Sequence, residues 1–335
     1  DDPDADTIMG DIMCQQKRWV KVFDNESDVE RFLGTKPVVS QLGLVTKHKY
    51  DERGRIIRTK KRVILDCKKS RANDLARAQQ RILLPRPFHA VDDALRLMRV
   101  CRARARRTAK KRTSTATPLV EHLVADYEDA YWAIPLHPRE RRFQVARFRH
   151  QWLVFLRTGQ GTKTGGLTWG LISALCGRFG QSLFDIWELL LQVYTDDPLS
   201  AVAGTLEERD TRMACIMVLW MVLGLGVAFH KAARGFDVVW IGAQFLLRGE
   251  QVIVTVNPDL IDEILLSIRG MLQLSAVPVK DVRRLAGQAN HVSGLVFSWR
   301  PFLSDLWGAL AAVARKPNRI HGKIWTRQIR ASLYW

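Results

Sequence analysis

The sequence predicts an α+β fold, in which a mixed body of strands and helices precedes an all-helical C-terminal part. Short apolar runs bounded by turn residues alternate with amphipathic segments through most of the chain, whereas about the last ninety residues show only the three-and-four spacing of helices. A length of 335 residues suits two domains, and 47% hydrophobic with 26% charged residues excludes disordered, collagen-like and coiled-coil architectures.

The segment from Pro37 to Asp66 predicts a strand, a turn at Asp51 to Gly54, and a second strand. Basic side chains crowd this hairpin, which is therefore either an edge protected by charge or a finger that contacts phosphates. These side chains are Lys47, Lys49, Arg53, Arg55, Arg58, Lys60, Lys61 and Arg62.

A helix is predicted over residues 89–116, because apolar residues recur there at helical spacing. Its second half is strongly basic, and such a run lies on a solvated face, forms a loose connector or follows nucleic-acid phosphates. The basic residues are Arg99, Arg102, Arg104, Arg106, Arg107, Lys110, Lys111 and Arg112.

The middle of the chain combines strands, a glycine-rich loop and a helix. A strand passes into a polar segment after Asp126, and a loop from Gly159 to Gly170 leads into a helix near Leu171 to Phe179. Residues 189–204 predict two short strands about a tight turn at Thr195 to Pro198.

The run from Met213 to Phe229 is uncharged, so we ask whether it is long enough to span a membrane. It falls just short of the about 18 apolar residues that a spanning helix needs. Because Gly224 and Gly226 interrupt the run, we interpret it as a buried helix that ends at these glycines, and we expect no membrane association.

The C-terminal third begins with a hairpin and continues as helices. Residues 238–247 and 251–256 predict two strands about a turn at Arg248 to Glu250. Asn257 is expected to cap a helix that starts at Pro258. A second helix presents Val282, Leu285, Ala286, Ala289 and Val292 on one face, and a third opens at Pro301.

Charge and cysteine content indicate the class of partner and the compartment. Lys and Arg total 52 against 34 Asp and Glu, a net charge of +18, which favours binding to nucleic acid first and to an anionic membrane surface second. The cysteines are Cys14, Cys67, Cys101, Cys176 and Cys215, too widely spaced for a zinc knuckle. We expect a reducing intracellular location, in cytoplasm or nucleus.

Three carboxylates form the candidate chemical site. Asp196 and Asp197 are adjacent in a predicted turn, where their repulsion is relieved either by water or by a divalent metal. Asp126 ends the apolar run LVAD. If the two strands are neighbours in one sheet, Asp126 and Asp196 can share a site for two metal ions that promotes phosphoryl transfer.

Several segments match one family in their order along the chain. They are KKRVILDCKKSRAN (Lys60 to Asn73), VADYEDAYWAIPL, TGQGTKTGG, YTDD, LGLGVAFHKA, Trp240-Ile241-Gly242 and VRRLAGQANHVSGLVFSWRPFLSDL. Together they resemble a reverse transcriptase, the RNA-directed DNA polymerase of retrotransposon-type elements, over about Pro37 to Leu310.

The resemblance implies a right-hand polymerase with fingers, a ferredoxin-like palm made of an antiparallel sheet plus helices, and a helical thumb. The expected domains are an N-terminal extension at 1–36, fingers at 37–117 and 139–167, palm at 118–138 and 168–250, and thumb at 251–335.

The resemblance also implies a role for each matching site residue. Asp126, Asp196 and Asp197 would be the catalytic, metal-binding carboxylates for two Mg²⁺ ions, with Mn²⁺ as a substitute. Lys231 would protonate the leaving pyrophosphate, although a surface lysine explains it equally well. The expected nucleotide-binding residues are Arg62, Tyr131, Gln160 and Gly161 with Lys47 or Lys49, and the expected primer grip is Trp240, Ile241 and Gly242.

Tyr131 would abut the sugar of the incoming nucleotide and exclude a 2′-hydroxyl, whereas from the residues alone it reads as a core tyrosine in AYWAI. The expected partners are an RNA or DNA template with a primer, and dNTP substrates; the sequence does not indicate an oligomeric state.

Two departures from the family pattern stand out. Gly159 occupies a position where many members have Pro, and Thr195 is polar where relatives are often apolar. Two alternatives remain open: an RNA-dependent RNA polymerase, against which Tyr194 and Tyr131 argue, and a non-catalytic nucleic-acid-binding relic of a retroelement.

Overall fold

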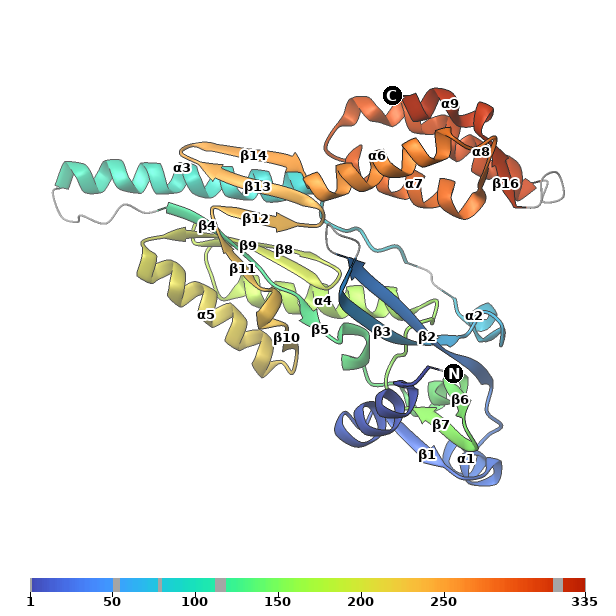
Figure 1. Cartoon of the computed structure of the whole chain (residues 1–335). Helices are drawn as coiled ribbons and strands as arrows, with labels where there is room; N and C mark the ends of the chain where they lie inside the picture. The colour runs from blue at the N-terminus through green and yellow to red at the C-terminus, as the bar shows by residue number, and fades with distance from the viewer. Residues whose placement is uncertain (1, 51–54, 78–79, 112–118, 316–321, 335) are drawn as a thin grey trace. The chain divides into compact units, whose positions relative to one another are not determined.

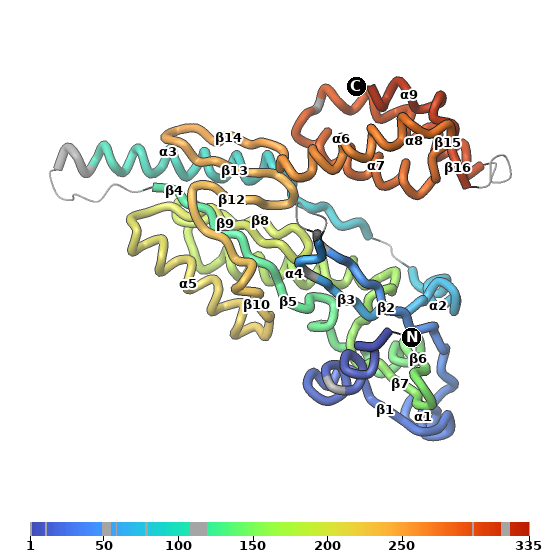
Figure 2. The backbone as a smooth tube through the Cα atoms, viewed as in Figure 1, coloured from blue at the N-terminus to red at the C-terminus, as the bar shows by residue number. Residues whose placement is uncertain are grey.

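The computed structural model describes residues 2–50, 55–77, 80–111, 119–315 and 322–334. The chain forms two compact units, traced in Figures 1 and 2. Unit 1 comprises Asp1–Leu84, Asp126–Gly180 and Ile216–Phe229, and unit 2 comprises Pro85–Ala125, Gln181–Cys215 and His230–Trp335. The mixed body predicted from the sequence is confirmed as α+β.

Unit 1 is built on a sheet with strand order β1-β7-β6-β2-β3. Its largest element is the predicted basic hairpin, which is confirmed; the turn predicted at Asp51 to Gly54 lies outside the described residues. The apolar face of the sheet packs on the N-terminal π-helix η1 through Met9, Met13 and Leu65. The bounds are η1 Thr7–Gln16, β1 Val20–Phe23, α1 Glu26–Leu33, β2 Val39–Tyr50, β3 Ile56–Asp66, α2 Ala72–Leu75, η3 Pro138–Phe143, β6 Val145–Phe148 and β7 Gln151–Phe155.

The second half of the predicted glycine-rich loop, from Gly165 on, is helix. α4 spans Gly165–Ser182, so the helix begins well before Leu171. Glycine occurs here because of close packing: a Cβ on Gly165 would lie 2.6 Å from the Thr162 hydroxyl and 3.2 Å from the Tyr131 ring. A Cβ on Gly170 would likewise lie 2.6 Å from Ile82.

Unit 2 contains a sheet with strand order β11-β4-β9-β8. The helix predicted over 89–116 is confirmed as α3 as far as Lys111, and residues 112–116 lie outside the described residues. Its apolar face packs on this sheet through Ala94, Leu97 and Cys101 against Val120 and Ala201. Arg112 of the basic run lies outside the described residues. The bounds are α3 Pro87–Lys111, β4 Leu119–Val124, β8 Leu189–Tyr194, β9 Asp197–Gly204 and β11 Ala233–Gly235.

A three-stranded meander covers part of the same core. β12 (Asp237–Trp240), β13 (Ala243–Arg248) and β14 (Gln251–Val256) pair consecutively. The prediction of one strand over 238–247 was therefore wrong, because the chain reverses at Ile241 and Gly242, whose φ angles are 42° and 75°. Positive φ at both central residues suits a tight hairpin turn.

An ion-pair group in which Glu121 and Arg209 are buried and Arg234 is exposed joins the sheet to the helix α5 (Leu206–Val222). Glu121 on β4 accepts hydrogen bonds from Arg209 at 2.9 Å and from Arg234 at 2.9 and 3.1 Å. Burial alone would raise the pKa of Glu121, but these hydrogen bonds outweigh it and lower the pKa.

The helix predicted in the uncharged run from Met213 to Phe229 ends just before Gly224, as expected, but it is buried on only one side. α5 ends at Val222, and the chain then enters β10 (Gly226–Val227) after a left-handed Gly224 with φ of 78°. Met213, Ile216 and Trp220 are buried, whereas Val218, Met221 and Val222 are exposed. Among the described residues, no helix is long and apolar enough to cross a membrane.

The C-terminal part of unit 2 is mainly helical, as predicted, with a small two-stranded ladder. Asn257 caps α6 by accepting a hydrogen bond from the Asp259 backbone N–H. The third predicted helix starts at Ser304 and not at Pro301, which lies inside a preceding 3₁₀ segment. The bounds are α6 Pro258–Leu272, β15 Ala276–Pro278, α7 Val279–Val292, η5 Phe297–Leu303, α8 Ser304–Arg315, β16 Lys323–Trp325 and α9 Thr326–Tyr334.

A buried histidine makes the stability of unit 2 depend on pH. His122 on β4 is fully buried, its ring nitrogens have no hydrogen-bond partner among the described residues, and burial lowers its pKa to about 4. The unfolded chain takes up a proton near pH 6.5 and the folded chain only near 4. The free energy of unfolding therefore decreases as pH falls between these values, by up to about 1.4 kcal/mol per pH unit.

His122→Leu is expected to flatten this slope, as measured by urea denaturation between pH 4.5 and 7. The exposed His150, replaced by Gln, provides the control and should leave the slope unchanged. An unaltered slope in His122→Leu would contradict the assignment.

Candidate functional site

The paired aspartates lie at a tight turn in the unit 2 sheet. β8 and β9 pair in register up to Tyr194 and Asp197, which leaves Thr195 and Asp196 as the turn residues, as predicted. Thr195 has a φ of 57°, a left-handed conformation that is strained for a β-branched residue. Asp196 and Asp197 are half-buried. The fold thus maintains a strained turn at the predicted chemical site.

Trp240 holds the backbone of this turn. Its indole Nε1–H donates a hydrogen bond to the Asp197 carbonyl oxygen at 2.9 Å. The ring is buried in the core and meets Tyr194 edge-on, with the ring centroids 6.4 Å apart. This tryptophan therefore contacts the residues on both sides of the turn, a role that the sequence analysis missed when it assigned Trp240 only to the primer grip.

Backbone pairing brings the end of β4 next to the start of β9, where the paired aspartates lie. β4 and β9 pair antiparallel from Leu119 opposite Gly204 to Val124 opposite Leu199. The Ala125 N–H then donates to the Pro198 carbonyl at 3.0 Å, which extends the pairing by one residue. Asp126 is the next residue along the chain and the first of this segment in unit 1.

Within unit 1, the backbone around Asp126 is held from two directions. The Asp126 carbonyl accepts a hydrogen bond from the Ala228 N–H at 2.9 Å. The next side chain, Tyr127, is buried edge-on against Trp169 and Trp220, at centroid distances of 5.7 and 5.3 Å. Burial raises the pKa of Tyr127. The Asp126 side chain itself is half-buried.

The three carboxylates have the donor chemistry that Mg²⁺ requires. Each presents hard oxygen atoms at or next to a strand end and is half-buried, so that it is accessible to an ion. Among the described residues, no group of three or more His, Cys, Asp or Glu side chains is placed to hold a metal ion. Sharing of one metal site by Asp126 and the aspartates of unit 2 stays a prediction.

The remaining candidates in unit 2 lie in two turns. Lys231 ends the 3₁₀ segment η4 (Phe229–Lys231) and is exposed. Ile241 packs in the core cluster that also contains Tyr194. Gly242 lies against α7, where a Cβ would come within 2.6 Å of His291 Nε2. The predicted primer-grip residues therefore form a turn closely packed on both sides.

In unit 1, predicted phosphate-binding cations share one face of the β2–β3 hairpin. Lys47 is opposite Lys60, and Val45 is opposite Arg62, so these side chains lie on the same face. Lys47 and Arg62 are exposed. The side chain of Lys49 lies outside the described part of the structure. The hairpin thus presents Lys47 and Arg62 together, as the sequence predicts.

The Gln160–Gly161 loop is attached to β3. The Leu65 N–H donates to the Gln160 carbonyl at 2.9 Å, and Gln160 forms a parallel bridge with Ile64. Gly161 has a φ of 111°, and a Cβ there would lie 2.0 Å from the Leu65 carbonyl oxygen. Only glycine fits this position, because both the conformation and the available space exclude a side chain.

Asn73 closes the same loop and was not singled out from the sequence. Its amide N–H donates to the Gly161 carbonyl at 3.0 Å, and its Oδ1 accepts from the Lys163 N–H at 2.8 Å. Asn73 is the last residue of the segment KKRVILDCKKSRAN. Because asparagine is common in turns, nothing in the sequence indicated a role for it at the Gly161 loop.

Tyr131 lies in the 3₁₀ segment η2 (Ala130–Ala133) and packs against the start of α4. Its ring is 3.2 Å from the position of a Cβ on Gly165, and its hydroxyl is 3.5 Å from that of Gly166. It is half-buried, unlike its neighbours Ala130 and Trp132, which are buried. The side chain therefore stands at the rim of the unit 1 core and not inside it.

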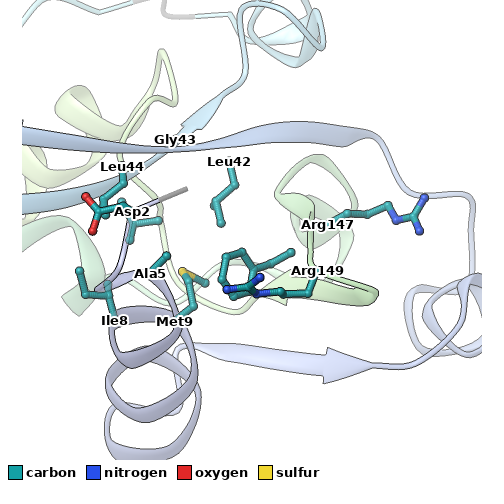
Figure 3. A pocket seen from close by; sticks show the side chains of 11 residues that line it. Asp2, Ala5, Ile8, Met9, Leu42, Gly43, Leu44, Arg147 and Arg149 are labelled. Atoms are coloured by element: carbon teal, nitrogen blue, oxygen red, sulfur yellow. The ribbon is translucent and has the colours of Figure 1, made fainter.

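Unit 1 also contains a hollow of about 530 Å³ between η1 and β2 (Figure 3). Its walls are mainly apolar, and none of the predicted site residues lines it. The acidic N-terminal segment is tied down beside it, because Asp2 and Asp4 pair with Lys61 and Asp6 pairs with Arg149. This hollow is separate from the candidate site.

Comparison with known proteins found solved structures with a similar fold but no match by sequence. No family model matches the chain, and no curated protein matches its sequence. The foamy viral protease–reverse transcriptase in complex with an RNA/DNA hybrid is similar in structure, with a TM-score of 0.52 and 13% identity over 93% of this chain. A dRH form of that protein in complex with double-stranded DNA has a TM-score of 0.48 and 14% identity over 87% of this chain.

The chain spans only part of these proteins, 34% of the first and 44% of the second. Each of the two was solved in complex with nucleic acid. At such low identity, the likeness concerns the fold. The α+β chain described above therefore has a reverse-transcriptase-like, polymerase-like fold.

Proposed function

We propose that this chain is an RNA-directed DNA polymerase domain of a retrotransposon-type element. The observation that carries the proposal is the pairing of β4 with β9, which ends at the Ala125–Pro198 hydrogen bond. Continuing the same register by one residue would bring position 126 opposite position 197. The carboxylates of Asp126, Asp196 and Asp197 would then face one reaction centre.

In this proposal, Asp126 and Asp196 hold two Mg²⁺ ions with Asp197 close by. When bound, the ions would lower the pKa of the primer hydroxyl and neutralise charge on the leaving pyrophosphate. The chain's own residues position the reactants: the primer 3′-oxygen attacks the α-phosphorus of a dNTP, and the bond from that phosphorus to the bridging oxygen breaks. The hydroxyl proton leaves to solvent, and Lys231 donates a proton to pyrophosphate.

Residues of unit 1 would bind the incoming nucleotide. Arg62 and Lys47, exposed on one hairpin face, would contact the triphosphate with Lys49. The Gln160–Gly161 loop, held by Leu65 and Asn73, would line the nucleotide and template. The Tyr131 ring would lie against the sugar. Trp240, Ile241 and Gly242 would form the primer grip.

The net charge of +18 supports binding of primer and template through their phosphates. Such binding is largely independent of sequence and weakens as salt concentration rises. A non-catalytic nucleic-acid-binding relic would share this property, so binding alone does not test the proposal, and extension of a primer does.

Asp196→Asn is expected to abolish DNA synthesis and to leave nucleic-acid binding intact. The substitution keeps the shape of the side chain but removes a charge worth several kcal/mol to the metal-assisted step, so that extension should fall by about a thousandfold. The assay is extension of a DNA primer on an RNA template with dNTPs and Mg²⁺, beside a binding titration on the same duplex.

Asp262→Asn is the matched control, because Asp262 is an exposed aspartate on α6 and its loss changes the net charge equally. A wild-type chain that binds the duplex but never extends it, with or without Mn²⁺, would establish the relic instead.

Tyr131→Val is expected to admit ribonucleotides. Removal of the ring would leave room for a 2′-hydroxyl, and the ratio of dNTP to rNTP incorporation should drop by at least tenfold, or about 1.4 kcal/mol. Tyr131→Phe keeps the ring and should keep the selectivity. Equal use of rNTPs and dNTPs by the unaltered chain would refute this role for Tyr131.

Trp240→Phe tests whether the hydrogen bond to the Asp197 carbonyl positions the turn. The substitution keeps an aromatic ring in the core and removes one hydrogen bond, worth about 1 kcal/mol. Primer extension should fall severalfold. Because the Trp240 side chain is buried and cannot itself touch the primer, and Ile241 and Gly242 are unaltered, the Kd for primer–template should stay constant.

Phe245→Leu is the control for this change. Phe245 is fully buried in the same core cluster, its ring centroid lies 6.1 Å from that of Trp240, and it has no hydrogen-bond donor to lose. If both substitutions reduce extension to the same degree, packing and not the hydrogen bond is responsible.

A further inference from the structure

A hollow of about 440 Å³ lies in the helical C-terminal part of unit 2. It opens where the segment after α6 meets β16 and the start of α9, elements that Figure 1 draws in orange to red. None of the residues assigned to the polymerase site lines it. Its wall includes Gln273, Ser275, Trp325, Arg327 and Arg330. This volume is large enough for one nucleotide.

The charged residues that line the hollow, Arg327 and Arg330, are both basic. After Asp305 the chain contains no Asp or Glu, whereas it contains Arg315, Lys316, Arg319, Lys323, Arg327 and Arg330. Arg327 and Arg330 are exposed. Arg330 donates a hydrogen bond to the Tyr334 hydroxyl at 3.4 Å, and within the described part of the chain neither arginine forms an ion pair. Both guanidinium groups therefore retain their capacity to bind an anion.

An aromatic ring lies beside each of these cations, and both rings are accessible to solvent. The Arg327 guanidinium lies 5.8 Å from the centre of the Trp325 ring, and the Arg330 guanidinium lies 5.7 Å from that of Tyr334. Trp325 is 40% exposed. An exposed tryptophan beside arginines is the combination on which unpaired bases stack while their phosphates are neutralised.

The backbone beneath the tryptophan is rigid. Trp325 pairs with Ala276 in the β15–β16 ladder, and the preceding Ile324 is fully buried. The Thr326 N–H donates to the Ser275 carbonyl at 3.0 Å, and the Thr326 hydroxyl donates to the Leu274 carbonyl. Little ordering is needed before a ligand binds, which favours affinity.

We propose that this hollow binds one nucleotide of a single-stranded nucleic acid. The base stacks on Trp325, the flanking phosphates bind Arg327 and Arg330, and Gln273 and Ser275 offer hydrogen bonds to the base edge. A duplex does not fit this chemistry, because its bases are already stacked. The site goes beyond the proposed polymerase reaction and stands without it, since it uses neither the carboxylates nor nucleotide addition.

Photocrosslinking of the full chain tests the proposal. A single-stranded RNA of about twelve nucleotides containing 4-thiouridine is irradiated with the protein, and the crosslinked peptides are mapped by mass spectrometry. We expect a crosslink in residues 323–330, with a half-saturating RNA concentration that rises about tenfold in Trp325→Leu. Duplex RNA of the same sequence should not compete at this peptide.

Matched variants separate a binding role from a structural one. Trp307→Leu and Arg283→Gln/Arg284→Gln alter an exposed tryptophan and exposed arginines elsewhere in the same part of the chain, and should leave the crosslink unchanged. Arg327→Gln/Arg330→Gln keeps the tryptophan and should flatten the salt dependence of binding at this peptide by about 1.4 in log–log slope.

Crosslinks that map only elsewhere, or that persist unchanged in both the Trp325 and the Arg327/Arg330 variants, would overturn the proposal. Primer extension by the same preparations keeps this outcome distinct from a failure of the polymerase assignment.

Discussion

The antiparallel pairing of β4 with β9 is the constraint on which the rest of the structure depends. Through it, β4 lies between β9 and β11, and the sheet so formed supports α3 on its apolar face. The buried Glu121, held by Arg209 and Arg234, fastens the same strand to α5 and β11. The pairing also determines where the strands terminate: β4 ends at Val124, one residue before the Ala125–Pro198 hydrogen bond, and β9 begins at Asp197. A shift of one residue would reverse every side chain of β4 between the two faces.

Around the candidate site, the fold controls backbone positions more than it supplies reactive groups. Trp240 holds the Asp197 carbonyl, Asn73 holds the carbonyl of Gly161, and Ala228 holds that of Asp126. In the β8–β9 turn, Thr195 is held in a strained, left-handed backbone conformation. The proposed phosphoryl transfer would need such control, because in that reaction a protein contributes mainly by positioning reactants and neutralising charge.

Local patterns in the sequence were sufficient for the basic hairpin, α3, the turn at Thr195 and the cap at Asn257, because each depends on neighbours in the chain. Local patterns gave wrong predictions where contacts between residues distant in the sequence determine the secondary structure. Gly165 and Gly170 look like loop residues, yet they lie in α4, and these positions are glycine because Thr162 and Ile82 leave no room for a side chain. Likewise, the strand over 238–247 appeared continuous, since the positive φ of Ile241 is imposed by surrounding packing. The partner of Trp240 Nε1 is a carbonyl 43 positions away, which no local pattern reveals.

The most direct test of a shared metal site is the location of Mn²⁺ in crystals of the full chain with primer–template and a non-reactive dNTP analogue. Anomalous scattering identifies the ion independently of its ligands. The account predicts a peak within about 2.5 Å of carboxylate oxygens from both Asp126 and Asp196. Carboxylates of these two residues separated by well over about 10 Å, far beyond the reach of a shared ion, would contradict it.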